Sequence, residues 1–229
     1  MKTRLISFLT FVLVLFGCGD APHVQKEARI LAMGDSLMAA HGLSNRAISD
    51  VVAKQLTQPV VDRSVLGARM IYNLPLTGAA GLSIPQQYRA GDWDWVIVNG
   101  GGNDLWLGCG CFACRAKMDK LISKDGLRGK IPGLLNTLRK DGAKVVYVGY
   151  LRSPGLGSPI EHCRDEGNEL ESRIAKLAEL DSGLYFLSNA DLVPHGDRSY
   201  HGFDMIHPSL KASTAIGERI SELIRSAEQ

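Results

Sequence analysis

The sequence predicts an α/β protein in which helices cover both faces of a parallel β-sheet. Short runs of aliphatic and β-branched residues alternate with longer amphipathic stretches, which is the pattern of strands joined by helical crossovers. Several of the short runs are almost continuously apolar, as parallel strands buried on both faces must be. Right-handed crossovers then give a three-layer α/β/α sandwich, with ligands expected beyond the carboxyl ends of the strands.

Five short apolar runs are the predicted strands, and they cover residues 29–33, 60–65, 93–99, 144–150 and 184–188. Amphipathic stretches predict helices over residues 45–56, 125–141, 160–180 and 208–227. Pro208 suits the first turn of the last helix, because proline already has a helical φ and its missing N–H is not needed there. Asp141-Gly142 ends the second helix, because glycine readily adopts the left-handed C-cap conformation.

Composition and charge indicate one ordinary globular domain. The chain has 229 residues and is 45% hydrophobic, which is enough for one substantial core, expected over residues 28–229. The 26 lysines and arginines are nearly balanced by 24 acidic residues, leaving a net charge of +2. Nothing in this balance indicates a nucleic-acid-binding face, so a small or neutral substrate is predicted instead.

The N-terminus has the features of an export signal. Lys2 and Arg4 precede residues 5–16, which are apolar except for Ser7 and Thr10. This apolar stretch is shorter than a membrane-spanning helix.

The signal ends in Gly17-Cys18, which resembles a bacterial lipobox. The resemblance implies that residues 1–18 are the signal, that Cys18 becomes lipidated, and that residues 19–27 form a polar tether. The mature protein would then lie on the periplasmic face of a bacterial membrane without crossing it. The alternative is an ordinary secretory signal cut nearby, which would give a secreted or soluble periplasmic protein.

Apart from Cys18, the chain contains Cys109, Cys111, Cys114 and Cys163. An even number of cysteines in an exported chain predicts two disulfides, and four cysteines allow three pairings. Pairing Cys109 with Cys111 would close a very tight ring, and a bond from Cys163 to the cluster would join two loops. A four-cysteine zinc site is the alternative interpretation.

Candidate catalytic residues follow the predicted strands. Ser36 comes directly after the first strand in Gly34-Asp35-Ser36-Leu37, although such residues also suit a simple turn. Asn103 follows the third strand, where its amide can donate to a developing oxyanion, and Gly67 follows the second, where its N–H can approach a ligand. Before the last helix, Asp204 and His207 can act as an orienting carboxylate and a general base.

Together these four blocks resemble the SGNH (GDSL) hydrolase family, and the resemblance covers nearly all of the chain after the tether. The run 30–37, followed by Gly42-Leu43, is most similar to the lysophospholipase, thioesterase and arylesterase branch. The resemblance implies a flavodoxin-like sheet and a Ser36-His207-Asp204 triad. It also implies an oxyanion hole made by the Ser36 N–H, the Gly67 N–H and the Asn103 side chain, with no cofactor or metal.

The implied activity is carboxylester hydrolysis of small lipid-like, thioester or aryl ester substrates. The segment around Gly67 carries Asp62, Leu66 and Ala68 where that branch commonly has other residues, so the substrate stays open. A carbohydrate O-acetylesterase is the alternative enzyme, and an inactive hydrolase fold serving as a binding lipoprotein is the alternative outside catalysis. The oligomeric state is not predicted. The chain lacks a Gly-x-Ser-x-Gly motif around Ser36, which disfavours an α/β-hydrolase.

Substrate contacts are expected from loops at the same edge of the sheet. The candidates are Arg69, Tyr72, Trp106 and Arg152. The remaining histidines lack the Asp-x-x-His arrangement before a terminal helix, so surface or structural roles are predicted for them; they are His41, His162, His195 and His201.

Overall fold

The computed structural model describes residues 27–155 and 157–229. The predicted export signal, Cys18 and most of the tether lie outside these residues. Within them, no helix combines the length and apolar character needed to cross a membrane.

All five strands form one parallel sheet in the order β2-β1-β3-β4-β5. The strands are β1 (Ile30–Met33), β2 (Val60–Asp62), β3 (Trp95–Val98), β4 (Lys144–Val148) and β5 (Leu184–Leu187). In the register of the sheet, Ile30 pairs with both Val60 and Trp95. The prediction of a five-stranded parallel sheet is confirmed.

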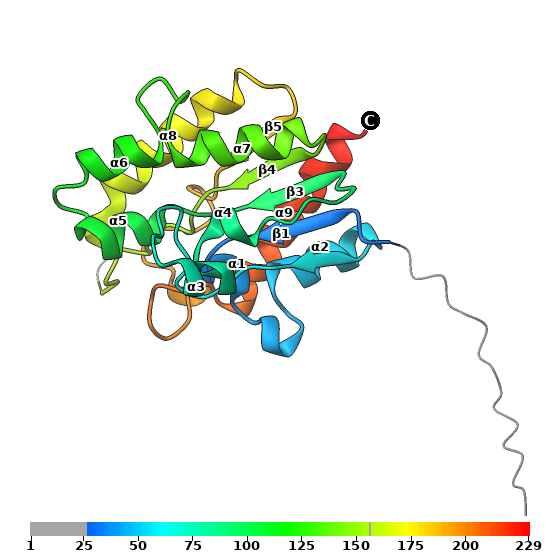
Figure 1. The fold of residues 1–229 in the computed structure, drawn as a ribbon. Helices are drawn as coiled ribbons and strands as arrows, with labels where there is room; N and C mark the ends of the chain where they lie inside the picture. The colour runs from blue at the N-terminus through cyan, green and yellow to red at the C-terminus, as the bar shows by residue number, and fades with distance from the viewer. Residues whose placement is uncertain (1–26, 156) are drawn as a thin grey trace, which may run out of the picture.

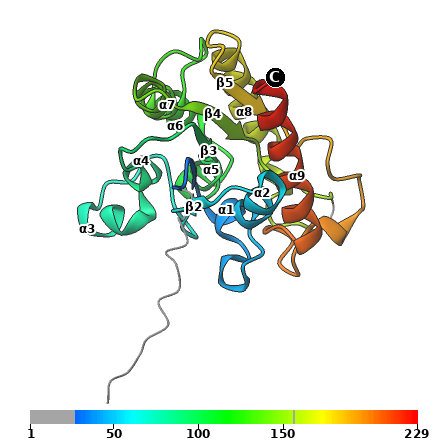
Figure 2. The same cartoon turned by 90° about the vertical axis from the view of Figure 1, so that its right-hand side faces the viewer.

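Helices cover both faces of the sheet, as Figure 1 shows. The principal ones are α2 (Ile48–Leu56), α6 (Arg115–Leu121), α7 (Lys130–Lys140), α8 (Arg164–Ala178) and α9 (Leu210–Ala227). Figure 2 shows α6 and α7 on one side of the sheet and α2 and α9 on the other. The predicted three-layer α/β/α sandwich is therefore the observed architecture.

Alternate strand residues belong to two hydrophobic clusters, one on each face of the sheet. Leu31 and Val96 pack with α6, α7 and α8, whereas Ile30 and Ile97 pack with α2 and α9. All four side chains are at most 1% exposed. Burial on both faces explains why the strands are almost continuously apolar in sequence.

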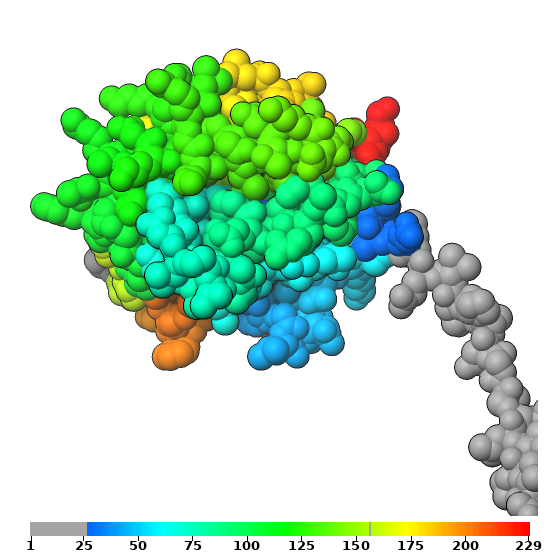
Figure 3. Space-filling view, in the orientation of Figure 1, coloured from blue at the N-terminus to red at the C-terminus, as the bar shows by residue number. Residues whose placement is uncertain are grey.

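Short helices fill the connections at the carboxyl ends of the strands. They are α1 (Ser36–Ala39), α3 (Pro75–Thr77), α4 (Ile84–Gln87) and α5 (Gly102–Cys109), with short turns at Gly42–Ser44, Gly78–Leu82, Glu161–Cys163 and Arg198–Tyr200. In Figure 3 the first described residues lie at one end of the molecule and the segment around α5 and α6 at the other.

Several predicted element boundaries are wrong for local reasons. Asn45 has a left-handed φ of 53°, so the first helix begins three residues later than predicted, at Ile48. The last helix begins at Leu210 because the Ser209 side chain caps it, accepting the Ala212 N–H. Pro208 lies outside that helix and forms an antiparallel bridge with His201.

Three other boundaries also differ. Helix α7 begins at Lys130, because Gly129 has a φ of 127°, which is incompatible with a helix. A 3₁₀ turn occupies Glu161–Cys163 at the start of the predicted third helix. The second strand ends at Asp62, whose carboxylate accepts the Ser64 N–H at 2.8 Å and so turns the chain.

Candidate active site

Ser36 is the first residue of α1, immediately beyond the end of β1. The Asp35 carboxylate caps this helix by accepting the Leu37 N–H at 3.0 Å. The Gln87 side chain holds the turn from the other side, because it accepts the Gly34 N–H at 2.7 Å and donates to the Gly34 carbonyl at 2.9 Å. These contacts fix the backbone on which Ser36 is carried.

His207 and Asp204 form a hydrogen-bonded pair, with 2.5 Å between Nδ1 and Oδ2. The other Asp204 oxygen accepts the main-chain N–H groups of Ile206 and His207, each at 3.0 Å. Burial raises the pKa of the Asp204 carboxyl, but these hydrogen bonds outweigh it and hold that pKa below its ordinary value. An ionised carboxylate therefore holds the imidazole of His207 through its Nδ1 atom.

Ser36, Asn103 and His207 line one cavity of about 410 Å³. They reach it from α1, from α5 and from the loop before α9. This arrangement agrees with the prediction that the segments carrying Ser36, Asn103 and His207 meet at the carboxyl edge of the sheet. Much of the remaining wall is apolar, including Trp106, Ile160 and Val193.

The Gly67 segment is held beside Asn103. The chain after β2 stays alongside β1, because the Val65 N–H donates to the Gly34 carbonyl at 3.1 Å. The Asn103 side chain then donates to the Ala68 carbonyl at 3.1 Å. A primary amide has two N–H groups, so this bond leaves a second donor for a ligand. Gly67 itself is not part of the cavity lining.

Asp104 is a positioning residue that the sequence analysis did not identify. Its two carboxylate oxygens accept the main-chain N–H groups of Met70 and Ile71, each at 2.8 Å. The side chain is buried, and burial raises its pKa to about 6. The sequence did offer a signal, namely a carboxylate directly after the candidate amide donor.

Two of the four predicted substrate-loop residues line the cavity. Trp106 and Arg152 do so, whereas Arg69 and Tyr72 lie outside the lining and contact each other, with the guanidinium 5.9 Å from the ring centre. The Arg152 charge is neutralised by Glu171 in a bidentate pair at 2.7 and 2.8 Å. Arg152 therefore shapes the wall rather than offering a free cation.

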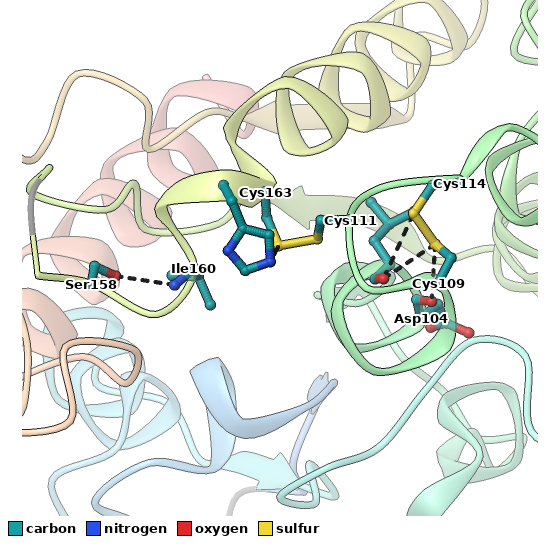
Figure 4. Close-up of a disulfide and its surroundings, with 9 residues drawn as sticks. Asp104, Cys109, Cys111, Cys114, Ser158, Ile160 and Cys163 are labelled. Atoms are coloured by element: carbon teal, nitrogen blue, oxygen red, sulfur yellow. Dashed lines mark hydrogen bonds between the residues drawn. A yellow bond between two sulfur atoms is a disulfide. The ribbon is translucent and has the colours of Figure 1, made fainter.

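The four cysteines form the disulfides Cys109–Cys114 and Cys111–Cys163, shown in Figure 4. The second joins the turn after α5 to the start of α8, and both of its cysteines line the cavity. The side chains of Cys111, His162 and Cys163 lie close enough together to suggest metal ligands. A cysteine must be a thiolate to bind zinc, however, and all four sulfurs are in disulfides, so the four-cysteine zinc interpretation does not fit this structure.

The histidines outside the candidate triad differ in their surroundings. The ring of His41 contacts the Pro208 carbonyl at 2.9 Å, and His201 is buried at 6% exposure, in keeping with structural roles. His195 instead lines the cavity, which the sequence analysis missed because the loop that carries it has no recognisable motif.

The chain belongs to the GDSL-like lipase/acylhydrolase family, whose model matches residues 32–215. Membership of this family defines the protein as an ester-hydrolysing enzyme. The comparison with curated proteins gives no match.

Solved structures of similar fold include a protein from Slackia heliotrinireducens described as an SGNH hydrolase, with 20% identity and a TM-score of 0.58 over 86% of this chain and 98% of that one. The structure of TesA is 21% identical, with a TM-score of 0.59 over 86% of this chain and 98% of that one. A family two carbohydrate esterase from Clostridium thermocellum, in complex with cellohexaose, is 21% identical, with a TM-score of 0.56 over 87% of this chain and 64% of that one.

Proposed function

We propose that this enzyme hydrolyses carboxylic esters with Ser36 as nucleophile and His207 as general base. The observation that carries the proposal is the shared cavity of Ser36, Asn103 and His207, together with the 2.5 Å contact between His207 and Asp204. A nucleophile, an amide donor and a base that border one cavity support this proposal.

The proposed reaction has two matched halves. Ser36 Oγ attacks the carbonyl carbon while His207 Nε2 takes the hydroxyl proton, and the tetrahedral intermediate then expels the alcohol, which receives that proton. Water next attacks the acyl-enzyme with His207 again as base, and the acid leaves as Ser36 Oγ recovers its proton. Asp204 stabilises the imidazolium formed in each half.

The negative oxygen of each intermediate needs donors that are already in position. The Ser36 and Gly67 N–H groups and the second N–H of the Asn103 amide are the proposed donors. In support, the main chain of the Gly67 segment is bonded to Asn103 through Ala68 and to Asp104 through Met70. The donors therefore belong to one connected assembly.

For the substrate we propose an acyl or aryl ester with a hydrophobic part. Apolar side chains supply much of the cavity wall, among them Leu105, Trp106, Ile160 and Val193. Burying such a substrate against them would contribute about 25 cal/mol for each Å² of apolar surface removed from water.

The carbohydrate O-acetylesterase is a second candidate, because one part of the wall is polar. Asn168, Arg164 and His195 line it and can hydrogen-bond to a polar alcohol such as a sugar. In this arrangement the acyl group is small, and the larger part of the substrate is the leaving group.

A mature enzyme anchored through Cys18, or secreted after cleavage nearby, is also part of the proposal. The sequence of the export signal supports it, and so does the presence of two disulfides, which persist in oxidising compartments.

One set of measurements tests these proposals. A fluorophosphonate should label Ser36 in the intact protein, as identified by peptide mass spectrometry, and Ser36→Ala should be neither labelled nor active. A panel of esters varied separately in acyl chain and alcohol then separates the two substrates. Activity retained on long acyl chains supports the hydrophobic ester, activity confined to acetyl groups supports the O-acetylesterase, and full activity of Ser36→Ala would refute the mechanism.

A further inference from the structure

The hydroxyl group of Tyr150 connects the two segments that carry the proposed oxyanion donors. It accepts the Gly102 N–H at 2.8 Å and donates to the Asp35 carboxylate. Asp35 is the residue before Ser36, and Gly102 is the residue before Asn103. One side-chain oxygen thus joins the start of α1 to the start of α5.

The ring of Tyr150 is fixed in place by its neighbours. A Cβ atom on Gly102 would lie 2.6 Å from Tyr150 Cζ, so only glycine permits the ring to pack this closely. The Tyr150 N–H donates to Glu171 Oε1 at 2.9 Å, and Glu171 is itself held by Arg152. The bridging hydroxyl therefore has little freedom to move.

Asp35 depends on this bridge. Its side chain is 1% exposed, and its other oxygen is used in capping Leu37. A buried carboxylate needs hydrogen bonds to replace the water it has lost. Burial raises the pKa of Asp35, while the hydrogen bond from Tyr150 and the nearby His207 oppose that rise. Tyr150 thus supplies a hydrogen bond to the buried side chain next to Ser36.

We propose that Tyr150 is a positioning residue that sets the spacing between the Ser36 and Asn103 donors, acting through Asp35 and Gly102. The inference rests on the proposed function, because it concerns the oxyanion hole of that reaction. Donors at the wrong distance still bind the neutral ester but stabilise the tetrahedral oxyanion less. Loss of the bridge should therefore lower kcat and leave KM almost unchanged.

The direct test is Tyr150→Phe, which removes the hydroxyl and keeps the ring. Its matched control is Tyr147→Phe, because the buried Tyr147 hydroxyl donates to the Gly100 carbonyl at 2.8 Å, two residues from Gly102, and does not line the cavity. Tyr147→Phe loses one buried hydrogen bond and Tyr150→Phe loses two, so both variants should melt at a lower temperature than the wild-type protein. Only Tyr150→Phe should lose kcat, by roughly tenfold to a hundredfold, less than the loss of a whole oxyanion donor.

Asp35→Asn tests the same bridge from its other end and keeps Tyr150. It should show the same selective loss of kcat, and the Asp35→Asn/Tyr150→Phe double variant should be little worse than the poorer single variant, because both changes break one connection. If Tyr150→Phe folds poorly, Asp35→Asn serves as the test on its own. A kcat of Asp35→Asn equal to that of the wild-type enzyme then overturns the inference.

Failure of the inference can be told from failure of the proposed function. If Ser36 is labelled by the fluorophosphonate and Ser36→Ala is inactive, the function stands, and a Tyr150→Phe enzyme with the kcat and KM of Tyr147→Phe overturns only the positioning role. Fully additive losses in the double variant overturn it as well. An active Ser36→Ala variant refutes the function, and the inference falls with it.

Discussion

The carboxylate of Asp104 accepts the main-chain N–H of Met70 at 2.8 Å, and this contact holds the segment carrying Gly67 against the helix that carries Asn103. Asp104 also accepts the Ile71 N–H at 2.8 Å. Two strands that are not neighbours, β2 and β3, therefore contribute to one site through a buried carboxylate.

Asp104 should make stability depend on pH. Its pKa is raised from 3.8 to about 6 in the folded protein, so folding favours the protonated form, and this contribution is lost as pH rises from about 4 through 6. Over that range the wild-type protein should lose up to about 3 kcal/mol relative to Asp104→Asn. Unfolding of both proteins in urea between pH 4 and pH 7 measures the difference, and parallel curves would contradict it.

Asn103→Ala should lower kcat by about a hundredfold to a thousandfold, the effect of removing one oxyanion donor. KM should change little, because the lost bond forms mainly with the charged intermediate. Asn136→Ala is a suitable control, since Asn136 lies on α7 and does not line the cavity. Steady-state kinetics on one ester measure both variants, and a KM effect of equal size would place Asn103 in ground-state binding instead.

The two disulfides should differ in their contribution to stability. Cys111–Cys163 closes a loop of 52 residues and Cys109–Cys114 one of 5. Loop entropy alone gives about 4 kcal/mol for the longer and about 2 kcal/mol for the shorter.

Paired serine replacements, Cys111→Ser/Cys163→Ser and Cys109→Ser/Cys114→Ser, compare them by chemical denaturation. Only the first pair removes a bond from the cavity wall, so it should also reduce activity more. Equal losses of both stability and activity would count against this assignment.

Arg152→Ala should cost about 3 to 5 kcal/mol, because it leaves Glu171 as an unpaired buried charge. The exposed fractions of the two side chains are only 17% and 7%. Arg29 and Asp94 form an ion pair with 41% and 53% exposure, and Arg29→Ala should cost much less, because solvent screens an exposed pair. Denaturation of the two variants under the same conditions provides the comparison, and similar costs would show that Glu171 finds another partner.

Much of the sheet could be predicted from sequence because its strands carry a strong local signal. Ile30–Met33 and Trp95–Val98 are wholly apolar and wholly buried. The helices α5 and α6 were not predicted, because they are short and are separated by a turn rich in cysteine and glycine. In this segment the two disulfides constrain the chain, and the sequence has no long amphipathic pattern that would predict a helix.

The candidate nucleophile, base and amide could be found because each stands in a motif after a strand or before a helix. The supporting residues could not be found in this way. Gln87 contacts Gly34 across 53 positions, and Tyr150 contacts Asp35 across 115. Neither has a sequence neighbour that reveals its partner, so only the folded chain identifies them.

The direction of the strands determines which end of the protein would face a surface to which its N-terminal side is attached. Glu27, the first described residue, lies three residues before β1 and hence at the amino-terminal edge of the sheet. The residues that line the cavity include Ser36, which follows the carboxyl end of β1, so the cavity lies at the opposite edge. A bilayer or a resin bead attached on the side of Glu27 would hold the protein by the end that is remote from the cavity. Substrate can then arrive from the surrounding solution without passing the point of attachment.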